Sequence, residues 1–223
     1  HQGGGYCPEK RGCHESTAAE ETIDGLNFFR TPLVTGGGAQ LPVLGELALM
    51  RALEQRLEEV VDRVLPDIIH AHSPVLNVLP ALKVGRRHGL PVVYEIRAFW
   101  EDAAVDHGTT TEGSLRYRSI RALETYALKR VDHAFTICEG LRKDIVQRGI
   151  SAEKVTVIPN AVDVNAFQLA GQPSLDLLEK YRLTNKTVIG FIGSFYAYEG
   201  LDLLLDALPE LLVARPDIRV LLV

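Results

Sequence analysis

From residue 67 onward the chain alternates short apolar runs with longer segments of helical periodicity, and this alternation constrains its fold more than any other feature. Strand–helix–strand units of this kind build a parallel sheet. The apolar runs lack the strict apolar–polar alternation of half-exposed strands, which favours strands covered on both faces. The predicted strands are residues 67–71, 91–96, 133–138 and 155–158. We therefore predict an α/β protein with a parallel sheet.

Helical segments fill the intervals between these strands. Leucine and valine residues spaced three and four apart predict a long amphipathic helix over residues 44–64, which ends before Pro66. Further helices are predicted at residues 75–88, 112–130 and 139–148. In the first 40 residues, glycine clusters and polar stretches predict loops around one short strand at residues 26–30.

Past residue 158 the pattern changes to a predicted turn and an irregular stretch with one short helix at residues 175–181. A predicted strand, helix and strand then restart the alternation, at residues 187–192, 201–213 and 218–223. We expect three parts: a first Rossmann-like domain over 1–158, a linker over 159–185, and the beginning of a second domain over 186–223. Since the chain begins at a histidine and stops inside a predicted strand, we expect a fragment of a longer protein.

The composition excludes several classes of protein. With 46% hydrophobic and 24% charged residues the chain has an ordinary globular composition, and its net charge of −5 lacks the basic footprint of nucleic-acid binding. No apolar run reaches the ~18 residues of a membrane span, and no secretory signal pattern opens the chain. The three cysteines, Cys7, Cys13 and Cys138, lack zinc-site spacing and fit a reducing compartment. We expect a cytoplasmic protein.

Polar side chains follow the predicted strands, at the edge where open α/β sheets bind ligands. They are His70 and His72 at the end of the first strand, and Arg97, Glu101 and Asp102 after the second. A polar loop at residues 106–113 follows, which is either a lid over a substrate or an exposed connector. Chemistry is therefore expected at this edge of the sheet.

Four motifs in a fixed order resemble the group 1 glycosyltransferases of family four. They are residues 67–72 (DIIHAH), 131–141, 154–163 with Phe167, and 190–193 with 199–205. The resemblance covers residues 26–223 and implies the GT-B fold, in which two Rossmann-like domains face a cleft. The sequence of residues 94–102 and 194–200 further resembles the branch found with exosortase A systems and exopolysaccharide gene clusters.

The resemblance implies a metal-independent, retaining transferase that uses a nucleotide-sugar donor. The acceptor, a glycan or a lipid-linked molecule, would bind the first domain and the donor the second. The family's first strand and most of its donor domain would lie outside this chain, so we expect the fragment alone to be inactive. No metal or other cofactor is expected.

The resemblance also assigns candidate catalytic residues. His72 matches the second histidine of the strand-end motif and would line the acceptor side, while we expect His70 to point into the sheet. Arg97 stands where family members often carry a histidine; arginine cannot act as a base but can hold a phosphate or carboxylate, or else form a surface ion pair. Glu101 would orient Arg97 or an acceptor hydroxyl, unless it belongs to a solvated turn.

The candidate donor-binding residues are Gly193, Ser194, Phe195 and Glu199, after the predicted strand at 187–192. In the family the residue after the first glycine is commonly Arg, and the residue before the next glycine is commonly Lys. Both basic side chains are replaced here, by Ser194 and Glu199. Either the cations that hold the donor diphosphate come from elsewhere, or the protein does not bind a donor in the usual way.

Three alternatives stay open. The helix at 112–130 carries a basic face that either contacts anionic lipid at the inner membrane surface or is solvated and ion-paired. The basic residues are Arg116, Arg118, Arg121, Lys129 and Arg130. The protein is alternatively a non-catalytic GT-B-like partner, or a sugar-nucleotide epimerase of the same fold. A dinucleotide-dependent enzyme is disfavoured because no GxGxxG follows a strand.

Overall fold

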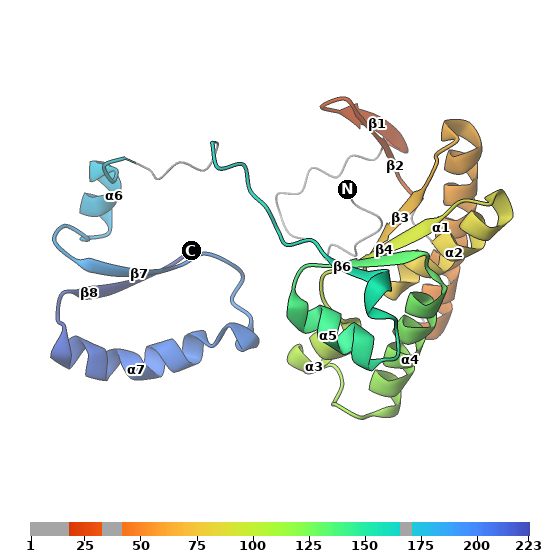
Figure 1. Ribbon diagram of the computed structural model, residues 1–223. Coiled ribbons are helices and arrows are strands. Elements are labelled where there is room, and N and C mark those ends of the chain that lie inside the picture. The colour runs from red at the N-terminus through yellow and green to blue at the C-terminus, as the bar shows by residue number, and fades with distance from the viewer. Residues whose placement is uncertain (1–17, 33–41, 166–170) are drawn as a thin grey trace. The chain divides into compact units, whose positions relative to one another are not determined.

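The computed structural model describes residues 18–32, 42–165 and 171–223 (Figure 1). These residues divide into two compact units. Unit 1 comprises the described residues up to 103 together with 112–160, and unit 2 comprises residues 104–111 and the described residues from 161 onward. The predicted loops around residues 3–5 and 36–38, Cys7, Cys13 and the Phe167 position lie outside the described residues.

Unit 1 contains a four-stranded parallel sheet with the strand order β3-β4-β5-β6 (Figure 1). Its strands are β3 (Ile69–His72), β4 (Val92–Ile96), β5 (His133–Thr136) and β6 (Val155–Val157). The predicted α/β class with a parallel sheet is confirmed. The strand β3 runs through His72 instead of ending at residue 71, which decides where both histidines point.

Five helices accompany this sheet in the described sequence up to residue 160, and one of them was not predicted. They are α1 (Pro42–Val64), α2 (Val75–His88), α3 (Trp100–Asp106), α4 (Leu115–Arg130) and α5 (Glu139–Gln147). The expectation of a loop over residues 97–102 is wrong, because α3 begins at Trp100. Glu101 and Asp102 lie in its first turn, where carboxylates complement the positive end of the helix dipole.

The core of unit 1 forms where α2 and α5 pack against the strands and α1 and α4 pack against α2. Tyr94 and Ile96 of β4 and Val78 and Val84 of α2 are completely buried. Gly85 lets α2 approach β4, because a Cβ at this position would clash with the Val92 side chain and lie 3.0 Å from the carbonyl oxygen of Leu90. A tightly packed core therefore holds the edge of the sheet that carries the candidate site.

A β-hairpin precedes α1 in the chain. It pairs β1 (Glu20–Ile23) with β2 (Leu26–Phe29) in antiparallel register, so the prediction of a single strand here was incomplete. Asp24 and Gly25 form the turn with φ of 50° and 80°, as a two-residue type I′ turn requires.

Unit 2 contains a second strand–helix–strand segment, β7 (Thr187–Phe191), α7 (Leu201–Ala214) and β8 (Ile218–Leu222), with the two strands parallel. All three elements were predicted to within one residue. The short helix α6 (Leu175–Lys180) precedes them, and 3₁₀ turns occur at Ala152–Lys154 (η1, in unit 1) and Ala197–Glu199 (η2). Across the described ranges, no helix combines the length and apolarity needed to cross a bilayer.

Candidate functional site

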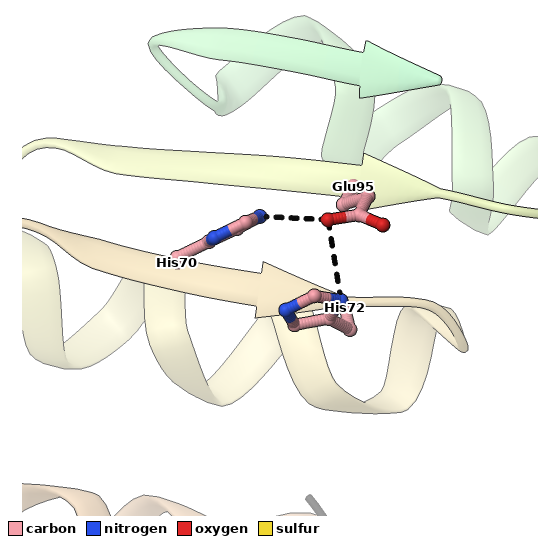
Figure 2. A group of neighbouring side chains, drawn as sticks. All are labelled: His70, His72 and Glu95. Carbon is pink, nitrogen blue, oxygen red and sulfur yellow. Dashed lines mark ion pairs between the residues drawn. The ribbon is translucent and has the colours of Figure 1, made fainter. Parts of the chain in front are cut away.

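Two histidines and one glutamate meet at the carboxyl ends of β3 and β4 (Figure 2). Glu95 Oε2 lies 3.3 Å from His70 Nε2 and 3.5 Å from His72 Nδ1, and the two imidazole rings stack with their centroids 4.4 Å apart. The prediction that His70 points into the sheet is wrong. Because β3 continues through His72, residues two apart share a face and both imidazoles turn toward Glu95. We call these three residues the histidine–glutamate cluster.

The surroundings of this cluster shape its protonation. Burial lowers the pKa of His72 even though the nearby Glu95 carboxylate opposes that shift, so burial favours the neutral imidazole. The second carboxylate oxygen of Glu95 lies 3.5 Å from Arg97 Nη1. The Arg97 side chain is half exposed, and its Nη2 donates to Asn160 Oδ1 at 2.7 Å. Arg97 therefore lies at the same edge of the sheet as His72 and is oriented by a carboxylate and an amide.

A cavity of about 500 Å³ opens beside the cluster within unit 1. Its walls are mainly apolar and its polar groups come chiefly from the ends of β3 and β4, the composition typical of small-molecule sites. The apolar lining comes from Phe29, Leu53, Leu57, Val60, Ile69, Ala71, Pro80 and Ala81. The polar lining comes from Thr31, Arg56, His70, His72, Ser73, Asn77 and Arg97. The sequence pattern pointed to His70, His72 and Arg97 but to none of the apolar wall.

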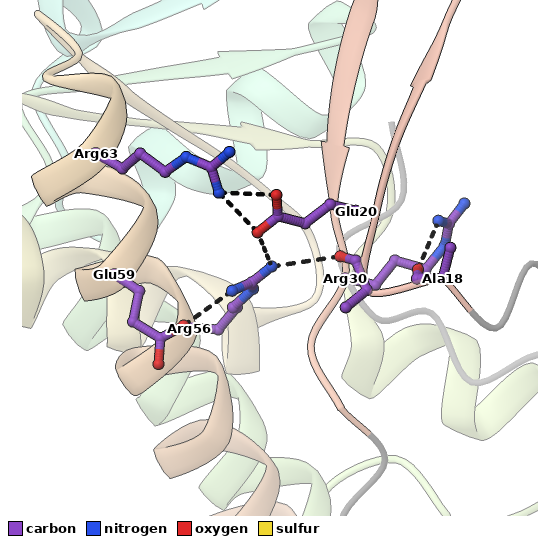
Figure 3. Close-up of polar contacts among 7 residues, drawn as sticks. Ala18, Glu20, Arg30, Arg56, Glu59 and Arg63 are labelled. Carbon is purple, nitrogen blue, oxygen red and sulfur yellow. Dashed lines mark hydrogen bonds and ion pairs between the residues drawn. The ribbon is translucent and has the colours of Figure 1, made fainter.

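The hairpin β1–β2 is fastened to α1 beside this cavity (Figure 3). The Glu20 carboxylate accepts from Arg63 Nη1 at 2.7 Å and from Arg56 Nη2 at 3.1 Å, and these hydrogen bonds lower the pKa of Glu20. The Phe29 ring lies 5.5 and 5.8 Å from the same two guanidinium carbons. The cavity-lining Arg56 is therefore held by the hairpin, a contact that the sequence pattern did not predict.

Glu101 does not lie where the sequence predicted. It belongs to α3, is fully buried and is not among the side chains that line the cavity. Its Oε1 lies 2.8 Å from Arg148 Nη1, whose guanidinium also binds Asp144 at 2.5 Å and covers the Phe99 ring at 3.7 Å. The ion pair of Glu101 is therefore with Arg148 in the interior of unit 1, and not with Arg97.

The candidate donor loop lies in unit 2 between β7 and α7. The backbone N–H of Gly193 donates to the Val223 carbonyl at 3.0 Å, and that of Glu199 donates to the Tyr196 carbonyl at 3.1 Å. Phe195 is 63% exposed. Two of the backbone donors that an anion would use are therefore already bonded within the chain.

The basic face of α4 is partly engaged. Arg121 lies 3.9 Å from Asp144, and the Arg130 guanidinium covers the Tyr126 ring at 3.5 Å. The structure thus shows ion-pair and ring contacts for two of the five cations, as a solvated helix face would have.

Comparison with known proteins identifies the class. Residues 6–161 match the family model of the glycosyl transferase 4-like domain, and the chain belongs to this family.

Among curated proteins, the chain is 25% identical over 151 residues to the Escherichia coli putative colanic acid biosynthesis glycosyl transferase WcaI, and the match covers 66% of this chain and 37% of the relative. It is 28% identical over 197 residues to the Mycobacterium tuberculosis phosphatidyl-myo-inositol mannosyltransferase, and this match covers 85% of this chain and 46% of the relative. It is also 27% identical over 180 residues to a phosphatidylinositol N-acetylglucosaminyltransferase component from Arabidopsis thaliana, where the match covers 79% of this chain and 34% of the relative. The chain spans less than half of the length of these relatives.

Among solved structures, Anabaena Alr3699/HepE in complex with UDP and glucose shares the fold with a TM-score of 0.59 and 20% identity, covering 80% of this chain and 44% of that one. A putative UDP-N-acetylglucosamine 2-epimerase from Listeria monocytogenes has a TM-score of 0.51 and 14% identity, over 79% and 45%. At these identities the likeness concerns the fold, and it supports the predicted GT-B type.

Proposed function

We propose that this chain is part of a glycosyltransferase that moves a sugar from a nucleotide-sugar donor to a glycan or lipid-linked acceptor in exopolysaccharide biosynthesis. The observation that carries the proposal is the cavity of unit 1, whose lining combines apolar walls with the polar side chains of His72 and Arg97. Such a cavity suits a molecule with an apolar portion and a polar reacting end. The family membership and the names of the relatives from E. coli and M. tuberculosis support this interpretation.

In this proposal unit 1 presents the acceptor. His72, beside Glu95, contacts an acceptor hydroxyl, and Arg97 holds a phosphate or carboxylate of the acceptor. Catalysis rests on positioning and on neutralising the departing diphosphate, with retention of configuration and without a metal at the diphosphate. In this proposal residues 1–158 belong to the acceptor domain, 159–185 to the linker and 186–223 to the donor domain.

The direct test is to incubate the intact protein with a panel of nucleotide sugars and to measure nucleoside diphosphate release with and without glycan and polyprenyl-linked acceptors. Acceptor-dependent release supports the transferase. Interconversion of the donor sugar without release would indicate the epimerase alternative. Nucleotide binding without either reaction would indicate the non-catalytic partner.

Reversing the charge of Glu199 tests whether the donor loop faces a diphosphate. Gly193, Ser194, Phe195 and Glu199 face the donor diphosphate in this proposal, so Glu199→Lys should tighten binding of UDP, GDP or both in calorimetry. Glu210→Lys makes the same charge change at an exposed position of α7 and serves as the control. Equal affinities for the two variants and the unmodified protein would show that the loop does not face the phosphates.

Peripheral binding at the cytoplasmic face of the membrane is a further part of the proposal, and it rests on the basic face of α4. The intact protein should sediment with anionic vesicles at low salt and be released at high salt. Absence of salt-sensitive sedimentation would remove this part while leaving the transferase assay unaffected.

A further inference from the structure

The histidine–glutamate cluster has the composition of a metal site. One candidate ligand atom from each of His70, His72 and Glu95 lies within 4.8 Å of the other two (Figure 2). Two imidazoles and one carboxylate form a common three-residue set for zinc, in which a fourth position stays open. We propose that this cluster binds one divalent transition-metal ion of the zinc class, with its fourth position open to the cavity of unit 1. This site goes beyond the proposed transfer reaction, which needs no metal at the donor diphosphate.

The distances within the cluster are compatible with a tetrahedral ion. Zinc bonds of about 2.0–2.1 Å to nitrogen and oxygen separate two ligand atoms by roughly 3.3 Å. The two distances from Glu95 Oε2, 3.3 Å to His70 Nε2 and 3.5 Å to His72 Nδ1, already match this separation. Only the two imidazole nitrogens must approach one another, by at most about 1.5 Å. Side chains that are 42% and 34% exposed can make this adjustment by rotation.

The backbone holds the three residues in place before any ion binds. His72 is paired with Glu95 in the parallel ladder of β3 and β4, and His70 is paired with Val93. Asn77 Nδ2 donates to the carbonyl of His72 at 3.1 Å, which supports the end of β3. Sites built on strands hold ligands more accurately than sites on loops, so little ordering is left for binding to require.

The neighbouring arginine makes the proposal more specific. Arg97 Nη1 lies 3.5 Å from the Glu95 oxygen that does not face the histidines, where it orients the carboxylate but also adds positive charge beside the ion. Removing this charge should therefore strengthen metal binding. Since both imidazoles line the cavity, the fourth ligand is water or an oxygen of the molecule that occupies it.

The test uses calorimetry with Zn²⁺ and the visible absorption of Co²⁺ on chelator-treated intact protein. The background carries Cys7→Ser and Cys13→Ser, because thiols near the N-terminus would compete for the ion. We expect one ion per chain, a tetrahedral Co²⁺ spectrum and its displacement by Zn²⁺. His72→Ala and Glu95→Gln should each weaken binding at least about tenfold, and Arg97→Gln should tighten it.

His88→Ala is the matched control, because His88 lies 2.7 Å from a carboxylate oxygen of Glu58 in a pair outside the cluster. It should leave binding unchanged. If a cluster variant fails to fold, X-ray absorption of the zinc-loaded background protein should still show imidazole and carboxylate ligands. No saturable binding, sulfur ligation, or affinities unaffected by His72→Ala and Glu95→Gln would mean that the cluster forms histidine–carboxylate ion pairs only. None of these readouts depends on sugar transfer, so either proposal can fail alone.

Discussion

Glu124 is a buried carboxylate of α4 whose replacement by glutamine should change the pH dependence of stability. The residue is 2% exposed. Burial raises its pKa from 4.5 to about 7; the Tyr94 hydroxyl opposes this rise and the negative charge of Glu101 adds to it. The folded protein therefore keeps this proton at pH values where the unfolded chain has lost it.

The sign of the effect follows from this difference in bound protons. Between pH 4.5 and about 7 the unfolded chain binds fewer protons at this position, so the free energy of unfolding falls as the pH rises. A pKa difference of one unit corresponds to about 1.4 kcal/mol. The rise from 4.5 to about 7 therefore lowers the free energy of unfolding by about 3 kcal/mol once the pH is above 7. Glutamine does not titrate, so Glu124→Gln avoids this loss.

The assay is urea unfolding of both proteins at about pH 4.5 and about pH 8, followed by fluorescence. Trp100 is the only tryptophan and lies in unit 1, so its emission reports on the unit that contains Glu124. The stability of Glu124→Gln relative to the unmodified protein should rise by up to about 3 kcal/mol between the two pH values. Glu112→Gln, at an exposed position, should show no such rise. A difference that is independent of pH, or that falls, would refute the reasoning.

Three further changes test the packing and ion pairs of unit 1. Arg148→Met leaves the fully buried Glu101 without its cation and should lower the free energy of unfolding by about 3–5 kcal/mol in urea; adding Glu101→Gln should restore much of this, and no recovery would contradict the ion-pair assignment. Gly85→Ala should cost about 1–3 kcal/mol by overpacking against β4. Gly140→Ala, where a Cβ meets only a sulfur at 3.7 Å, should not show this overpacking cost. Glu20→Gln should speed amide hydrogen exchange in the hairpin β1–β2; unchanged rates would mean that its two arginine contacts do not hold the hairpin.

Local signals predicted the elements whose boundaries are set by local chemistry. The helix α2 was predicted at residues 75–88 and has those bounds, because Pro74 precedes it and Gly89 ends it. Gly89 adopts φ of 68° and donates its N–H to the carbonyl of Gly85, a helix ending that glycine favours. The parallel strands were recognised for a similar reason, since continuous apolar runs are their direct signature.

Elements that depend on partners distant in sequence were missed. The helix α3 has seven residues, too few for a periodic pattern, and its buried Glu101 is accommodated by Arg148 at the end of α5. The hairpin β1–β2 carried a recognisable signal in Asp24 and Gly25, but its strands have four residues each and little apolar content in the first. Short strands of this kind give a weak pattern, and only the contacts of Glu20 with α1 show where the hairpin lies.

The orientation of His70 depended on a single residue of strand length. A strand that ended at residue 71 would have left the relation of the two histidines open, whereas β3 extends to His72 and places both on the face that meets Glu95. Strand ends are among the least certain features of a sequence prediction, because backbone pairing with the neighbouring strand sets them. The sequence thus pointed to the two histidines and Arg97 at this edge of the sheet, whereas Glu95 and the orientation of His70 became evident only from the structure.

The donor loop separates two kinds of motif residue. A Cβ at Gly193 would make a tight contact of 3.3 Å with the Phe191 ring, and Gly200 adopts a φ of 70° that favours glycine. Neither glycine needs a bound phosphate to account for it. The two positions that are commonly basic in the family are the part of the motif that would recognise a diphosphate. In this chain they are occupied by Ser194 and Glu199. The match of residues 6–161 to the family model also lies outside this loop. The Glu199→Lys comparison therefore tests whether this loop faces a donor diphosphate, while the proposed acceptor site rests on the cavity and on the family match.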